Sequence, residues 1–221
     1  MNGQGAAIRI EVYSDVICPW CYVGKRRLEQ ALHEMGETVR AHVVWRPFQL
    51  NPTMPQDGMD RTTYLQAKFS SLEAYRDMEH RLLEVGGSER ISFAFENIAR
   101  TPNTFLAHRL IWYAEIQGCQ DALVEQLFKG FFEDGLDIGS KVVLAEVADR
   151  AGLKADQFLM SDQGIAEVNA EESVGRKLGI RAVPYFVVDK IHGISGAQPV
   201  DVFVSTIQKV RSSTSAAVRS S

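Results

Sequence analysis

Two cysteines, Cys18 and Cys21, stand two residues apart in the segment "SDVICPWCYVG". The preceding residues 8–13 alternate between apolar and polar, which is typical of a strand with one buried face. Residues 19–35 carry apolar side chains at helical spacing, and Pro19 suits the first turn, where a missing N–H costs nothing. The sequence therefore predicts a strand that leads directly into a helix, with Cys18 at the helix N-terminus.

Three interpretations of the cysteine pair compete. A zinc site needs about four ligands, and the sequence has neither a second close cysteine pair nor histidines at ligand spacing. Two inert core thiols would have no reason to lie at a helix N-terminus, where free N–H groups and the helix dipole stabilise a thiolate. Thiol–disulfide exchange fits this placement best. We expect Cys18 to be the exposed, attacking thiol and Cys21 the shielded, resolving thiol, with no metal site.

A second strand over 39–48 completes a β-α-β unit, whose crossover we expect to be right-handed. In the rest of the chain, the spacing of apolar residues is first helical, then typical of strands, and finally helical again. The expected elements are a nearly all-helical block over 61–152, a helix near 162–178, the strands of a β-hairpin at 185–188 and 192–195, and an amphipathic helix over 199–210. The serine-rich residues 211–221 are expected to form a disordered tail.

The composition narrows the setting of this chemistry. The 221 residues carry a formal net charge of −4 and three cysteines, so there is no basic excess to pair with phosphates. We therefore expect neither nucleic acid nor a membrane surface as a partner. The N-terminus lacks the features of a secretory signal, and no apolar run approaches the ~18 residues of a membrane span. We expect a cytoplasmic protein, in which a close cysteine pair is more often catalytic or metal-binding than structural.

Four segments of the sequence resemble a known family: "SDVICPWCYVGKRRLEQAL", "NTFLAHRL", "GIRAVPYFVVD" and "ISGAQP". Together they resemble the DsbA-like thioredoxin-fold oxidoreductases, in particular the cytoplasmic branch called the FrnE family. The resemblance covers about residues 8–210 and implies an α/β protein, a thioredoxin fold with an inserted all-helical subdomain. Its first half would span 8–56, the helical insertion 57–160, and its second half 161–210.

The resemblance also implies roles for particular residues. It implies a cis bond between Val183 and Pro184, in a loop that faces Cys18 and binds extended substrate backbone. Trp20, an aromatic residue between the cysteines, is expected to meet substrates together with Pro19. Asn103, His108 and Arg109 are candidates for lining the cleft, although His108 could equally be a hydrogen-bonded helix residue.

One departure from the family pattern concerns the proton acceptor for Cys21. Thioredoxins and many DsbA-type proteins hold a buried carboxylate six positions before the attacking cysteine, where this chain has Val12. Asp15 is as consistent with a turn or cap residue as with a proton relay. The sequence leaves this acceptor open.

These features predict a cytoplasmic thiol–disulfide oxidoreductase or isomerase acting on protein or small-molecule disulfides. No metal or organic cofactor is required, and glutathione stays open as a co-substrate. The chain also resembles the kappa-class glutathione transferases and 2-hydroxychromene-2-carboxylate isomerases, so a glutathione-dependent isomerase or transferase is the alternative. Those relatives usually carry serine in place of Cys18 and lack its partner. A third reading is a holdase or scaffold with a vestigial pair. The natural substrate, the direction of electron flow and the oligomeric state stay open.

Overall fold

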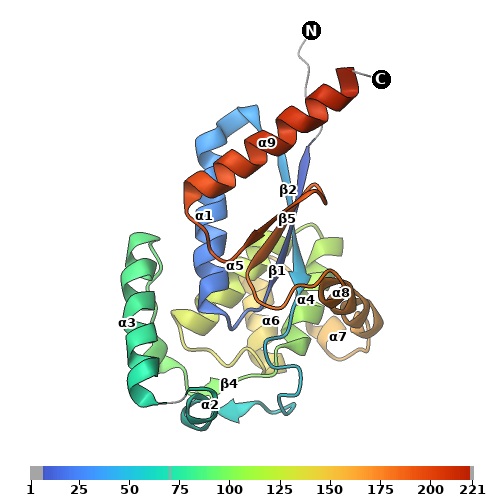
Figure 1. Ribbon diagram of the computed structural model, residues 1–221. Helices are drawn as coiled ribbons and strands as arrows, with labels where there is room; N and C mark the ends of the chain where they lie inside the picture. The colour runs from blue at the N-terminus through green and yellow to red at the C-terminus, as the bar shows by residue number, and fades with distance from the viewer. Residues whose placement is uncertain (1–6, 70, 220–221) are drawn as a thin grey trace.

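The structure, a computed structural model, describes residues 7–69 and 71–219. Its centre is a four-stranded sheet in the order β2–β1–β5–β6 (Figure 1). β1 runs parallel to β2 and antiparallel to β5, and β6 forms a hairpin with β5. This is the α/β arrangement predicted from the sequence. The strands are β1 (Ile8–Ser14), β2 (Ala41–Pro47), β5 (Tyr185–Val188) and β6 (His192–Ser195).

Helices surround the sheet and also form the long segment between β2 and β5. The described helices are α1 (Pro19–Met35), α2 (Arg61–Lys68), α3 (Leu72–Ser88), α4 (Phe105–Ile116), α5 (Gln120–Phe132), α6 (Lys141–Arg150), α7 (Asp156–Leu159), α8 (Ile165–Lys177) and α9 (Val200–Arg219). Two short 3₁₀ turns cover Gly36–Thr38 and Phe95–Asn97.

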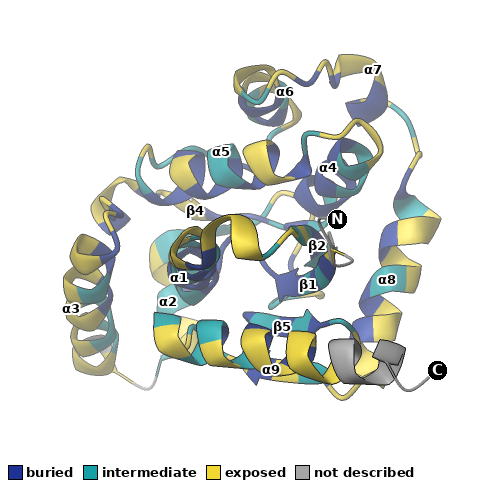
Figure 2. Ribbon diagram, turned by 90° about the horizontal axis from the view of Figure 1, so that it is seen from above, coloured by how far each residue is buried: buried dark blue, intermediate teal, exposed yellow. Residues whose placement is uncertain are grey.

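The two faces of β1 are covered by different helices. On one face, Val12 is paired with Phe186 of β5, whose ring packs closely against Gly24 of α1. On the other face, the Tyr13 ring packs against Gly175 of α8. Figures 1 and 2 show α1 and α8 on opposite sides of the sheet, and α9 packs beside α1. β1 is therefore a central, buried strand, which holds the segment that follows it firmly in place.

The helical block between β2 and β5 has two parts. α4 and α5 pack against β2 and share the main hydrophobic core with the sheet. α3 packs against α1, and α2 packs against α3 (Figure 2). The site at the N-terminus of α1 thus lies where the sheet, α2 and α3 meet.

The structure corrects two expectations about the elements. The block is not purely helical, because β3 (Met59–Asp60) and β4 (Arg100–Thr101) form a short antiparallel ladder. The final helix does not end at Val210, and residues 211–219 of the expected disordered tail are helical. The helix continues because the sequence offers no proline or glycine to stop it. Residues 220–221 lie outside the described part.

Candidate active site

Cys18 is the N-cap residue of α1, and Pro19 is the first residue of that helix. The Cys18 carbonyl accepts hydrogen bonds from the N–H groups of Cys21 and Tyr22, which close the first turn. Its own N–H donates to the Asp15 carbonyl, so the connection from β1 is a tight turn. This places the Cys18 sulfur at the positive end of the α1 dipole, as the sequence predicts.

The exposure of Cys18 differs from the expectation. Its residue is only 5 % exposed, and Cys21 is 1 % exposed, so both thiols are buried. Cys18 is covered because its Sγ lies 3.6 Å from the Val183 carbonyl oxygen, to which the thiol donates. The sequence could not show this cover, since the two residues lie in different halves of the chain.

Burial raises the pKa of the Cys21 thiol well above its ordinary value, and the neighbouring Cys18 adds to this effect. The adjacent Ser14 side chain and Asp15 backbone lower the pKa of Cys21 and so partly oppose this rise. Cys21 therefore keeps its proton at neutral pH, behind the thiol that caps the helix.

The loop before β5 faces the cysteine pair. The Val183–Pro184 peptide bond is cis, as the resemblance implies. The Pro184 ring packs against Gly24 in the second turn of α1, and the Pro184 carbonyl accepts the N–H of Gly196. The loop is thus fixed to both α1 and the segment after β6, with the Val183 carbonyl directed at Cys18.

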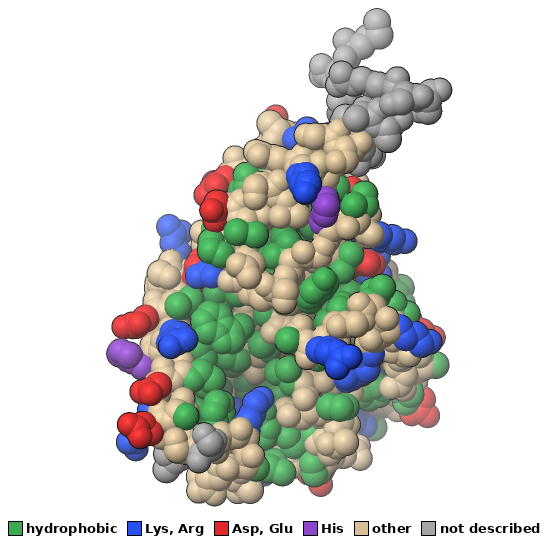
Figure 3. Space-filling view, in the orientation of Figure 1, with side chains coloured by type: hydrophobic (Ala, Val, Ile, Leu, Met, Phe, Trp, Pro, Cys, Tyr) green, Lys and Arg blue, Asp and Glu red, His purple; other side chains and the backbone are tan. Residues whose placement is uncertain are grey.

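A small cavity of about 160 Å³ opens beside Cys18. Pro19 and Trp20 line it on one side. Most of its other walls come from α2 and α3. The surrounding surface is mainly apolar, with charged side chains of both signs at its edges (Figure 3). The wall residues that the sequence analysis did not identify are Ile17, Leu50, Arg61, Tyr64, Leu65, Lys68, Phe69, Tyr75, Met78, Glu79, Leu82 and Phe95. No local motif marks those beyond Ile17, because the packing of α2, of α3 and of the segments that carry Leu50 and Phe95 brings them to Cys18.

The three candidate cleft residues do not line this cavity. Asn103 caps the turn before α4: its Oδ1 accepts from the Phe105 N–H and its Nδ2 donates to the Met54 carbonyl. Asn103 and Arg109 instead border a larger cavity elsewhere, and His108 is buried in the interior. None of the three lies at the cavity beside Cys18, because α4 passes behind the cysteine loop and not over it.

His108 points at Asp15, and both side chains are almost completely buried. The His108 Nε2 lies 3.4 Å from Asp15 Oδ1, while Asp15 Oδ2 accepts a hydrogen bond from the Leu50 N–H. Neither Nε2 nor Oδ1 makes a hydrogen bond of good geometry among the described residues. The contact between His108 and Asp15 therefore lies in the interior. Asp15 is also the residue at which the turn leading to Cys18 begins.

Comparison with known proteins identifies the family. The sequence matches the family described as "DSBA-like thioredoxin domain" over residues 9–208, which is nearly the whole chain. The chain belongs to this family. The DSBA-like assignment agrees with the fold and with a cysteine pair at the N-terminus of α1 beside the Val183–Pro184 loop.

Solved structures of DSBA-like and related proteins support the assignment. A "probable DsbA oxidoreductase" of Streptomyces coelicolor is 34 % identical, covers 91 % of this chain and 89 % of its own, and has a TM-score of 0.84. The cytosolic disulfide reductase DsbM of Pseudomonas aeruginosa, solved with GSH, is 15 % identical with a TM-score of 0.61, over 96 % of this chain and 99 % of its own. A 2-hydroxychromene-2-carboxylate isomerase is 14 % identical with a TM-score of 0.71, over 94 % and 98 %. The last two show a shared fold.

Among curated proteins, the "uncharacterized protein YwbO" of Bacillus subtilis is 28 % identical over 209 residues, covering 90 % of this DSBA-like chain and 96 % of its own. Within residues 7–69 and 71–219, no three His, Cys, Asp or Glu side chains are grouped so that they could hold a metal ion. Over the same residues, no helix is both long and apolar enough to cross a bilayer.

Proposed function

We propose that this DSBA-like protein is a thiol–disulfide oxidoreductase that uses Cys18 and Cys21 on disulfides of proteins or small thiols. The observation that carries the proposal is the asymmetry of the pair. Cys18 caps α1 at the mouth of a cavity, whereas Cys21 lies behind it with a raised pKa. A cytoplasmic location belongs to the proposal and is the location stated for the Pseudomonas reductase.

The reaction has two exchange steps. In the first, the Cys18 thiolate attacks one sulfur of a substrate disulfide, the substrate S–S bond breaks, and the other sulfur leaves as a thiolate that takes up a proton. In the second, Cys21 loses its proton and its sulfur attacks Cys18. The mixed disulfide breaks, the second substrate thiol leaves, and a Cys18–Cys21 disulfide forms. Two electrons pass from the pair to the substrate, and the reverse sequence oxidises a substrate dithiol.

The neighbouring groups have separate parts in this scheme. The N-terminus of α1 stabilises negative charge on Cys18, and the Val183–Pro184 loop presents a carbonyl for extended substrate backbone. The small apolar cavity accepts a side chain next to the substrate cysteine, because about 160 Å³ is below the range of whole-ligand pockets.

The second candidate is a glutathione-linked reaction of the isomerase or transferase kind. Arg61 and Lys68 at the cavity beside Cys18 are the observation in its favour, because two cations suit the carboxylates of glutathione. A transferase needs only one thiol, so turnover should then survive Cys21→Ser. Under our proposal, multiple turnover is lost in that variant.

The test compares Cys18→Ser with Cys21→Ser after incubation with oxidised glutathione, read by intact mass spectrometry. Cys21→Ser should accumulate one glutathione adduct, because its Cys18 can attack but the mixed disulfide cannot be resolved. Cys18→Ser should stay unmodified at Cys21. Cys119→Ser is the matched control and should keep full exchange activity. An adduct on Cys18→Ser alone would reverse the roles, and full activity in both variants would refute redox chemistry.

A further inference from the structure

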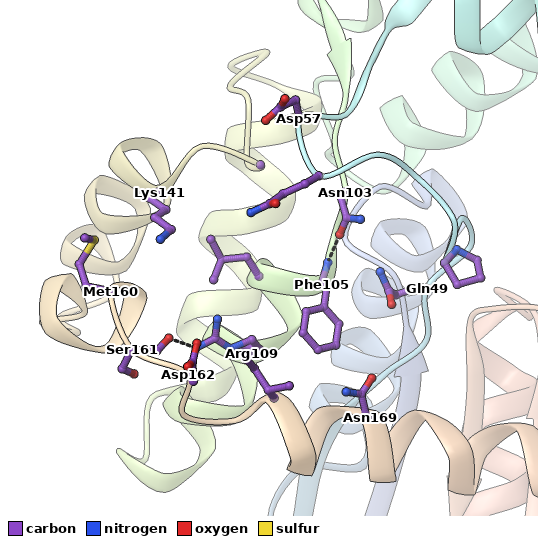
Figure 4. A pocket seen from close by; sticks show the side chains of 15 residues that line it. Gln49, Asp57, Asn103, Phe105, Arg109, Lys141, Met160, Ser161, Asp162 and Asn169 are labelled. Carbon is purple, nitrogen blue, oxygen red and sulfur yellow. Dashed lines mark hydrogen bonds between the residues drawn. The ribbon is translucent and has the colours of Figure 1, made fainter.

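A second cavity, of about 740 Å³, is separated from the cysteine pair by the loop that follows β2. Leu50 of this loop lines the cavity beside Cys18, whereas Gln49 and Pro52 line the second one. None of Cys18, Cys21 and Pro184 borders it. Figure 4 shows side chains entering it from the loop, from α4, from the start of α6, from α8 and from the segment before α8. Its volume lies within the ~300–1,000 Å³ typical of small-molecule sites.

Arg109 of α4 forms part of the wall and is only 7 % exposed. Its Nε donates to the Gln163 carbonyl at 2.9 Å and its Nη2 to the Ser161 carbonyl, while the guanidinium lies 5.4 Å from the centre of the Phe158 ring. These contacts anchor the segment before α8 and hold the guanidinium in one orientation. They leave Nη1 without a described partner, and a buried guanidinium with no carboxylate is costly.

Lys141, at the start of α6, enters the same cavity from a different helix (Figure 4). The cavity also contains Asp57 and Asp162, both exposed. Among the described residues, neither aspartate lies within ion-pair distance of Arg109 or Lys141. Burial lowers the pKa of Arg109 and outweighs the opposing charge of Asp162, so the nearby carboxylate does not compensate the buried cation.

We propose that this cavity binds a small organic anion, with its carboxylate or phosphate group between Arg109 and Lys141. Both anions match the planar donor fork of an arginine. The body of the ligand would lie against Phe105, Leu106 and Ile165, which supply the apolar part of the wall. This site goes beyond the redox function, because it shares no lining residue with the cavity beside Cys18.

The test is an NMR titration of the full-length, ¹⁵N-labelled protein with phenyl phosphate, benzoate and the uncharged benzamide. Backbone amides of Gly139, Lys141 and Asn169 should shift and saturate with an anion at millimolar concentration, and benzamide should leave them unchanged. Tighter binding of phenyl phosphate would assign a phosphate ligand, and tighter binding of benzoate a carboxylate. Equal shifts with benzamide, or shifts centred on Tyr64 and Trp20, would overturn the proposal.

Two variants test the cations separately. Lys141→Met should weaken binding about fivefold, the effect of losing one exposed charge. Lys177→Met, an exposed lysine at the far end of α8, is the control and should bind as the natural protein does. Arg109→Lys should weaken binding more than Lys141→Met. Although lysine keeps the positive charge, it lacks the planar pair of N–H donors that matches two oxygens of the anion. Unchanged affinity in Lys141→Met would refute the site even if the Arg109 variant proved unstable.

Discussion

Asp15 joins three parts of the molecule through one buried side chain and its backbone. Its carbonyl accepts the Cys18 N–H at 3.0 Å, and its Oδ2 accepts the Leu50 N–H at 2.7 Å. Its Oδ1 lies 3.4 Å from Nε2 of His108. One residue thus connects the cysteine turn, the loop after β2 and helix α4. The turn role that the sequence allows for Asp15 is observed, and the loop contact is additional to it.

Removal of the Asp15 carboxylate should destabilise the protein. Asp15→Ala leaves the Leu50 N–H buried without its acceptor, which costs about 1–3 kcal/mol of the free energy of unfolding. Asp15→Asn keeps an oxygen for Leu50 and should cost less. Urea denaturation of the reduced proteins measures both values, and an alanine variant as stable as the asparagine variant would contradict this role.

The raised pKa of Cys21 makes a kinetic prediction. Attack on the mixed disulfide needs the Cys21 thiolate, whose fraction grows about tenfold per pH unit below the pKa of the thiol. Release of glutathione from a preformed Cys18 mixed disulfide should therefore accelerate steadily between about pH 7 and 9. Stopped-flow measurement of the released thiol gives this rate. A rate that does not change with pH over this range would show that deprotonation of Cys21 is not limiting.

Elements defined by local sequence were predicted well, and contacts between distant elements were not. The hairpin strands at 185–188 and 192–195 have the expected bounds, and Asp189 and Lys190 in the turn have positive φ. α1 begins at Pro19 and ends at Met35, as its pattern and the following glycine indicate. The Asp15–His108 contact could not be predicted, because it depends on how α4 packs behind the sheet.

The end of α9 shows a different limit of sequence analysis. Among the side chains of α9 that the structure describes, the last buried apolar one is Val210, and the serines beyond it favour disorder by composition. In the structure, the hydroxyls of Ser212 and Ser213 donate to carbonyls one turn earlier, within a continuing helix. A helix that is already anchored by its buried turns gains one hydrogen bond for each residue that it adds, so composition alone misjudged this segment.

Two adjacent glycines of α3 allow a matched test of how this helix packs. A Cβ added at Gly86 would lie 2.5 Å from the Phe93 ring, whereas one added at Gly87 would meet nothing within 4 Å. Gly86→Ala should lower the free energy of unfolding by about 1–3 kcal/mol through overpacking. Gly87→Ala should raise it by up to about 1 kcal/mol through helix propensity. Thermal melts of both variants check this, and a Gly86→Ala as stable as Gly87→Ala would show that Phe93 moves freely.

At the scale of the whole molecule, a charged network joins the thioredoxin half to the helical insertion. Lys25 of α1 is 2 % exposed and forms ion pairs with Glu29 of its own helix and with Asp121 and Glu125 of α5. The Tyr22 hydroxyl donates to Glu133 at 2.7 Å beside the stacked Phe128 ring. Because these groups connect α1 to α5, the two parts should unfold together.

The buried thiol and phenol predict a loss of stability in alkali. Burial raises the pKa of Cys21, and the neighbouring Cys18 adds to this effect. Burial also raises the pKa of Tyr22, with a further contribution from its hydrogen bond to Glu133. The pKa of Tyr75 is raised to about 12 by its burial. A group whose pKa is higher in the folded protein than in the unfolded chain stabilises the folded state. This stabilisation is complete below the pKa of the group in the unfolded chain and is lost as the pH rises above that value. The reduced protein should therefore keep its stability up to about pH 9 and then lose about 1.4 kcal/mol per pH unit for each buried proton.

Urea denaturation in reducing buffer across this pH range measures the effect. Cys21→Ala provides the control, because its decline should begin about one pH unit later, where tyrosine in the unfolded chain begins to ionise. A free energy of unfolding that stays constant above this point would contradict the burial of both groups.

The order of the strands along the chain has a consequence for how the protein is made. β1 needs β5 on its free edge, and the Arg9 N–H donates to the Asp189 carboxylate, 180 residues later. At ~5–20 residues per second, a ribosome completes β5 on the order of ten seconds after β2. The helices between them are made in this interval and can begin to form from local contacts. Until β5 is made, the nascent chain carries half a sheet with an open edge, and it is in this interval that the chain is most exposed to aggregation.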